Sequence, residues 1–114
     1  MIVKKKFRLK KDQDFKQVIA ANHVQKNRIF VVYSNANEMG YPRVGISVSK
    51  KVGSAVTRNR IRRQIRMMVD QIINLEESVD LLIIVRSEYL NGDFEKNSKK
   101  LYELIDVPRR IINE

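Results

Sequence analysis

One stretch of the chain has hydrophobic residues at the spacing of an α-helix. They recur every three or four positions and form one apolar stripe: Ile61, Ile65, Met68 and Ile72. There is no Pro or Gly from Ser54 to Asn74, and the Ser54 hydroxyl is suited to accept a hydrogen bond from a first-turn amide. The pattern therefore predicts a helix of roughly five turns that starts at Ser54 and runs to about Asn74.

Two shorter helices are predicted near the two ends of the chain. The first spans about residues 12–21, with Asp12 as its cap and an apolar face formed by Phe15, Val18 and Ile19. The last spans about residues 93–105, and Pro108 is expected to end it. Its apolar positions are Phe94, Leu101, Leu104 and Ile105.

The other hydrophobic segments have the pattern of β-strands. Residues 28–34 are rich in β-branched and aromatic side chains, residues 43–49 alternate, and residues 81–85 form a continuous apolar run typical of a strand buried on both faces. Residues 24–26 are compatible with a short preceding strand. Residues 35–42 contain Asn, Gly and Pro and are predicted to be a hairpin loop.

The predicted order is helix, three strands, helix, strand, helix (α-β-β-β-α-β-α). This order favours an α+β fold with a small mixed sheet and helices packed mainly on one face. A length of 114 residues corresponds to a single domain, 1–114. Within it, residues 1–11 hold six basic residues and are expected to form a partly flexible arm, either a solvated tail or a segment that docks through Phe7 and Leu9.

The strand at residues 43–49 has an unusual face of small residues, Gly45, Ser47 and Ser49. Such a face lets a ligand approach the backbone closely, or it accommodates a packed helix. The sequence favours neither alternative.

The charge balance indicates a polyanionic partner. The chain has 23 Lys and Arg against 13 Asp and Glu, a net charge of +10. Nucleic acid fits this charge, and a membrane surface fits it less well because the predicted strands and helices can cover the apolar stripe. Charge alone does not distinguish DNA from RNA.

Other classes of protein are disfavoured by composition. The chain has no Cys and one His, which excludes the common zinc clusters and favours a cytoplasmic location over a small secreted domain. No apolar run is long enough to span a membrane or to act as a secretory signal. No set of side chains is spaced to activate a nucleophile or water, so a stand-alone nuclease is disfavoured.

Residues 50–66 are the most basic part of the chain, with seven basic residues and no acidic one. A solvated helix face is the ordinary explanation of such a run. A binding site for phosphates is favoured here because acidic partners are absent until Asp70, and because most of the cations are Arg, whose planar guanidinium matches phosphate oxygens in pairs.

Residues 47–66 closely resemble the signature of the protein subunit of bacterial ribonuclease P. The specific part is Arg58-Asn59-Arg60 followed by Arg62, Arg63 and Arg66. The likeness extends to residues 8–15, 30–33, 43–45 and 80–86.

The resemblance implies an activity and partners. Proteins of this family bind ribonuclease P RNA, and the assembly removes the 5′ leader of precursor tRNA. The RNA carries out the phosphodiester hydrolysis with Mg2+, so no metal site is expected in the protein. Binding to a membrane and an obligate protein partner are not expected either. It also implies a left-handed β-α-β crossover, whereas the sequence alone favours the usual right-handed one.

The resemblance also assigns residues to two sites. The residues expected to bind the catalytic RNA are Lys50, Arg58, Asn59, Arg60, Arg62, Arg63 and Arg66. The residues expected to form the leader-binding cleft are Phe15, Tyr33, Ser47, Lys51 and Arg86. Ile19 stands where the family often has an aromatic residue, which removes one stacking position.

Two alternatives stay open at this point. Phe15 is by pattern either a core residue or a ring on which an unpaired base stacks, while Tyr33 has a polar end that suits both uses. A ribosomal or RNA-chaperone protein would share the charge and fold of this chain, although not the exact Arg-Asn-Arg arrangement.

Overall fold

The strand β4 (Val79–Val85) lies at the centre of a four-stranded sheet. Its apolar run is buried along nearly its whole length, as a strand covered on both faces requires. It pairs antiparallel with β2 (Phe30–Ala36) and parallel with β3 (Arg43–Val48), and β2 pairs antiparallel with β1 (His23–Lys26). The strand order is therefore β1-β2-β4-β3. The computed structural model describes the backbone of residues 5–113 and the side chains of residues 5–105.

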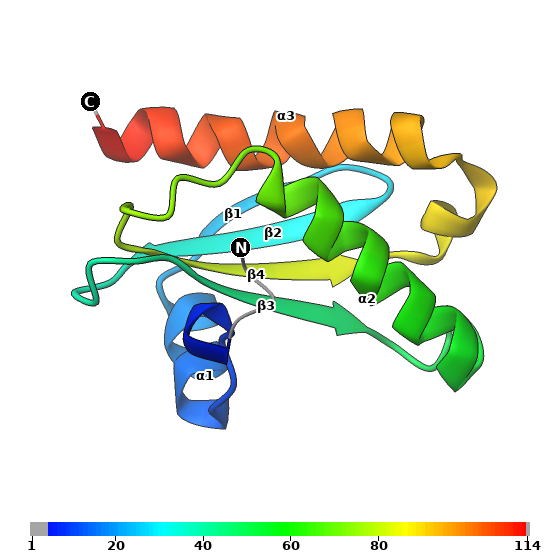
Figure 1. Ribbon diagram of the computed structural model, residues 1–114, viewed down its shortest axis with the longest axis horizontal. Coiled ribbons are helices and arrows are strands. Elements are labelled where there is room, and N and C mark those ends of the chain that lie inside the picture. Colours follow the sequence, from blue (N-terminus) through cyan, green and yellow to red (C-terminus); the bar gives the residue numbers. More distant parts are fainter. Residues whose placement is uncertain (1–4, 114) are drawn as a thin grey trace.

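The helices cover the two faces of the sheet unequally. On one face lie α2 (Ala55–Asp70) and α3 (Phe94–Asn113), which contact each other, and α1 (Asp12–Ala20) contacts β2 and β4 from the other (Figure 1). Two short 3₁₀ helices, η1 (Lys5–Phe7) and η2 (Ser87–Asn91), precede α1 and α3. The predicted α+β class, the mixed sheet and the element order are confirmed, with two of the three helices on one face.

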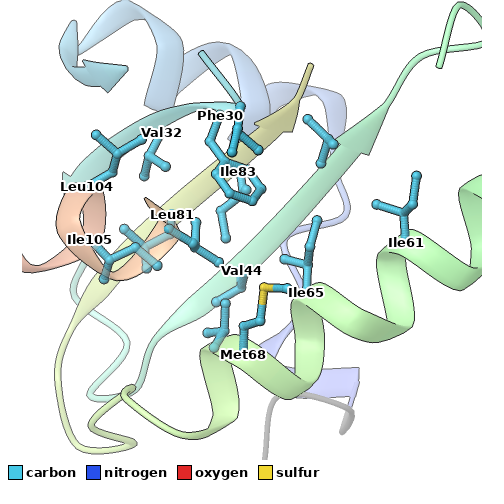
Figure 2. Close-up of a cluster of buried hydrophobic side chains, with 14 of the residues drawn as sticks. Phe30, Val32, Val44, Ile61, Ile65, Met68, Leu81, Ile83, Leu104 and Ile105 are labelled. Atoms are coloured by element: carbon cyan, nitrogen blue, oxygen red, sulfur yellow. The ribbon is translucent and has the colours of Figure 1, made fainter. Parts of the chain in front are cut away.

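The main core fills the space between the sheet and the α2–α3 layer. Figure 2 shows Ile61, Ile65 and Met68 of α2 and Leu104 and Ile105 of α3 along the strands, and all five belong to one buried core. Three positions of the predicted apolar stripe form the buried face of α2, since Ile61, Ile65 and Met68 are fully buried, whereas Ile72 lies beyond the end of the helix and is partly buried.

The connection β3–α2–β4 is a crossover between parallel strands. In Figure 1 both strands run to the right, β3 lies below β4, and α2 lies in front of the sheet. The chain therefore turns in the left-handed sense, as the resemblance implies and against the usual preference.

The predicted hairpin at residues 35–42 is wrong. This segment joins β2 to β3, yet the two strands do not pair, because β4 lies between them and pairs with both. A strand buried on both faces in the middle of a sheet needs a partner along each edge, and β4 obtains one from each of its neighbours.

Several predicted helix ends also differ from the structure. Asp12 is the first residue of α1 and not its cap, a position held by Lys11 without a side-chain hydrogen bond. The helix α2 ends at Asp70 because the amides of Gln71 and Ile72 bond to carbonyls three residues back and close the last turn. The helix α3 continues past Pro108, where a proline removes its own amide hydrogen bond without ending the helix.

The basic arm docks in part. Phe7 and Leu9 are buried, and the Leu9 amide donates to the Val44 carbonyl at 3.1 Å. The arm therefore pairs with the outer edge of β3 at Val44. Residues 1–4 of the arm lie outside the described residues.

Candidate nucleic-acid interface

The basic helix α2 starts at the predicted cap. The Ser54 hydroxyl accepts a hydrogen bond from the Thr57 amide at 3.3 Å, and Ser54 is the N-cap. Because the apolar stripe faces the core, the basic positions turn outward. Asn59, Arg60 and Arg63 are exposed, and Arg58, Arg62 and Arg66 are half-buried.

Arg62 and Arg66 extend toward the edge strand β3 and line a hollow of about 230 Å³ there. We call it the arm hollow, and its other lining residues are Arg8, Leu9, Lys10, Phe15, Val44, Gly45 and Ile46. Burial lowers the pKa of Arg66, and the charges of Arg8 and Arg62 lower it further. Arginines so close to one another create a local field that favours an anion.

A second hollow, of about 400 Å³, lies next to the first on the sheet face that α1 covers. We call it the cleft, and it is lined by Phe15, Ile19, Ile46, Ser47, Val48, Arg62, Leu82 and Ile84. Phe15 and Arg62 line both hollows, so an aromatic ring and a guanidinium stand where the two meet. An apolar floor with a cationic rim suits an unpaired base and its phosphate.

Gly45 explains how Phe15 comes so close to the sheet. A Cβ atom at Gly45 would lie 2.6 Å from Cε1 of Phe15, which is too near for any side chain. Of the two uses of the small-residue face, the structure shows a packed helix at Gly45, while Ser47 is exposed and lines the cleft.

An ionic network fixes α1 against the sheet. Arg43 donates to both carboxylate oxygens of Asp80, at 2.9 and 2.8 Å, and to Asp14 of α1 at 3.3 Å. Asn37 also donates to Asp80, at 2.8 Å. The hydrogen bond to Asp80 raises the pKa of Arg43. Because Phe15 directly follows Asp14, this network helps to position the aromatic ring.

The other predicted cleft residues are not all brought together. Tyr33 is half-buried and lies opposite Leu82, which lies opposite Gly45, so all three share the face of the sheet that α1 covers. Lys51 is exposed in the turn after β3, as is Lys50 before it. Arg86 follows β4, is exposed, and donates to the Asn27 carbonyl at 3.2 Å. Of the five, only Phe15 and Ser47 line the cleft itself.

Sequence reasoning missed some of the lining residues. Arg8 is predicted only as part of the arm, Ile46 lies on the apolar side of its strand, and Leu82 and Ile84 belong to the run predicted to be buried on both faces. Strand alternation separates the two faces of each strand, but the position of α1 on the sheet decides how much of its face stays uncovered. That position depends on contacts between residues far apart in the chain, such as Phe15 and Gly45.

The described residues include no group of three or more His, Asp or Glu side chains arranged to hold a metal ion. Nor does any helix in the described part of the chain have the length and apolar character needed to cross a membrane.

Comparisons with known proteins agree on one family. The family model described as Ribonuclease P matches residues 3–108. Among curated relatives, the ribonuclease P protein component of Mesoplasma florum is 46% identical over 105 residues, covering 90% of this chain and 96% of the relative. That of Streptococcus pneumoniae is 38% identical over 108 residues, covering 94% of this chain and 88% of the relative.

Solved structures show the same similarity in three dimensions. A mutant RNase P protein of Staphylococcus aureus with defective mRNA degradation activity superposes with a TM-score of 0.84 at 32% identity, over 95% of this chain and 92% of that one. The RNase P protein of Thermotoga maritima gives a TM-score of 0.74 at 29% identity, over 90% of this chain and 96% of that one. With its sheet order, its basic helix and these matches, the chain belongs to the ribonuclease P protein family.

Proposed function

We propose that this chain is the protein subunit of a ribonuclease P that matures the 5′ end of tRNA. In this proposal α2 binds the catalytic RNA, and the cleft binds the unpaired 5′ leader of precursor tRNA. The observation that carries the proposal is that Arg62 belongs to the basic helix and also lines the cleft beside Phe15. One continuous surface can therefore contact a large RNA and a single strand that leaves it.

In this proposal the protein binds the catalytic RNA and the leader, and the catalytic RNA carries out the hydrolysis. We assign no step of the hydrolysis to the protein. Mg2+ would be held by the RNA and the substrate. We also propose a cytoplasmic location, with ribonuclease P RNA and precursor tRNA as the partners.

The test is reconstitution with ribonuclease P RNA. We expect precursor tRNA to be processed at low Mg2+ by RNA and protein together and much more slowly by the RNA without protein, because the cations of the protein offset phosphate repulsion. Lys99→Gln, a substitution on α3 outside the two hollows, should support processing as well as the unchanged chain. Equal processing with and without protein would contradict the proposal.

A second candidate function comes from the S. aureus relative, whose mutant is named for defective mRNA degradation activity. The same experiment therefore includes the protein alone with precursor tRNA and with mRNA, in the presence of Mg2+. We expect both RNAs to stay intact. Cleavage of mRNA by this chain, abolished by the same substitutions that abolish RNA binding, would establish the second activity.

A further inference from the structure

A third hollow, of about 410 Å³, lies away from the cleft and the arm hollow. It is formed where the β1–β2 turn meets η2 and the first turns of α3, and we call it the α3 hollow. Its lining residues are Asn27, Arg28, Ile29, Glu88, Lys96 and Lys100. None of these residues lines the other two hollows.

Asn27 holds two of the segments that line the α3 hollow together. Its side-chain oxygen accepts from the amides of Ile29 and Phe30, each at 2.9 Å, and its side-chain nitrogen donates to the Lys100 carbonyl at 3.0 Å. The turn is therefore tied to α3, and the site is formed before any ligand arrives. Preformed sites avoid part of the entropy cost of binding.

The charge of the α3 hollow suits an anion. Three of its side chains are cations, and Glu88 is the one carboxylate that lines it. Glu88 accepts a hydrogen bond from Asn91, and Lys100 is 3.8 Å from Glu103 in an exposed pair. Among the described side chains Arg28 and Lys96 form no ion pair, so both are available to phosphates.

Arg86 connects the α3 hollow to the end of β4, because it comes two residues after Ile84, which lines the cleft. Arg86 donates through its guanidinium to the Asn27 carbonyl at 3.2 Å and through its amide to the Ile29 carbonyl at 2.8 Å. The ends of β3 and β4, the β1–β2 turn and the start of α3 all lie at the right of Figure 1. From β3 to β1 are three strand spacings, roughly 14 Å, which a few extended nucleotides can cover.

We propose that the α3 hollow binds backbone phosphates of the distal part of the 5′ leader, after the strand has left the cleft and passed Arg86. This inference rests on the proposed function, since it extends the path of the same strand. If the α3 hollow binds these phosphates, the affinity of the enzyme for precursor tRNA increases with the length of the leader.

The test compares three ligands of the reconstituted enzyme: mature tRNA, precursor with a leader of a few nucleotides, and precursor with a leader several times longer. The double variant Arg28→Gln, Lys96→Gln should lose the extra affinity for the long leader. The slope of log K against log salt for that ligand should fall by about 1.4, since each phosphate contact to a single strand is worth about 0.7. Affinity for the short leader should not change.

Two further variants sharpen the comparison. Glu88→Gln removes the opposing charge and should raise affinity for the long leader only. Lys99→Gln removes a cation from the same helix outside the hollow, where Lys99 lies 3.7 Å from Glu95, and should change nothing.

The outcomes separate this inference from the proposed function. Long-leader binding unchanged in the double variant, or equal losses for all three ligands, would overturn the α3 hollow as a leader site. Equal losses for all three ligands would mean that the cations of the α3 hollow contact the catalytic RNA or the tRNA body. Equal affinity of the unchanged enzyme for mature and short-leader tRNA would instead overturn the cleft assignment.

Discussion

At the scale of single residues, Tyr33 tests whether the proposed leader site extends beyond the cleft on the same face of the sheet. Its ring is half-buried on the sheet face that α1 covers, in register with Leu82 and Gly45. If a leader base stacks on it, Tyr33→Ala should weaken binding of precursor tRNA to the reconstituted enzyme by about 1 kcal/mol or more. Binding of mature tRNA should not change, because that ligand has no leader.

The matched control is Tyr33→Phe, which keeps the ring and should keep precursor affinity. Equal losses for precursor and mature tRNA with Tyr33→Ala would mean that the residue supports the fold or the assembly. The equilibrium dissociation constants of both ligands decide between the two.

Asp80 is a residue whose removal should destabilise the protein. It is 5% exposed and accepts from Arg43 and Asn37, so Asp80→Ala leaves the Arg43 charge poorly compensated in a largely buried position. Breaking such a pair costs roughly 3 kcal/mol of unfolding free energy. Urea unfolding measures this loss. Glu95→Ala, which breaks an exposed pair with Lys99, should leave the urea midpoint unchanged, and equal effects of the two would contradict the role of the network.

Which residues could be predicted from sequence depended on whether their role is local. The Ser54 cap and the buried stripe of α2 follow from spacing within one helix, and both are confirmed. The contact of Phe15 with Gly45 joins residues far apart in the chain, so the sequence left the use of the small-residue face open.

At the scale of elements, α2 divides its cations between two surfaces. Arg60 and Arg63 are exposed on the outside of the helix, whereas Arg62 and Arg66 line the arm hollow. Arg60 and Arg63 do not line the cleft, so substituting them tests binding to the catalytic RNA separately from binding to the leader.

We expect Arg60→Ala, Arg63→Ala to weaken binding to ribonuclease P RNA and to lower the slope of log K against log salt by about 1.4–1.8. The physical reason is that binding releases fewer counterions from the RNA when the protein makes fewer phosphate contacts. Lys99→Ala on α3 is the control and should keep the slope. A slope unchanged in the double variant would mean that the outer face of α2 is merely solvated.

The elements themselves were largely predictable, whereas their ends and partners were less so. Hydrophobic periodicity located the helices and strands in the correct order. The predicted hairpin between β2 and β3 failed because strand pairing depends on β4, which comes later in the chain. The helix α3 passes Pro108 because proline weakens a helix locally and other contacts decide whether it continues.

At the scale of the whole molecule, the two faces of the sheet serve different purposes. The face under α2 and α3 holds the main core, with side chains such as Phe30 and Ile83 fully buried. Among the described residues, the other face carries one α-helix, α1 of nine residues, together with Leu9 of the arm, which leaves room for the cleft beside them. The sequence alone favoured the wrong crossover hand, because nothing local in β3 or α2 specifies on which face the helix packs.

The position of β4 also governs the order in which the protein can fold during synthesis. The ribosome makes β2 and β3 before β4, yet β2 and β3 do not pair with each other and are joined in the sheet only through β4. Until residues 79–85 emerge, the nascent chain can form the β1–β2 hairpin and the isolated helices, but it cannot close the sheet. The basic helix is then made before the core that orients it, and an unsupported basic segment attracts any nearby polyanion. If α2 binds RNA as proposed, the late central strand delays selective recognition until residues 79–85 have left the ribosome.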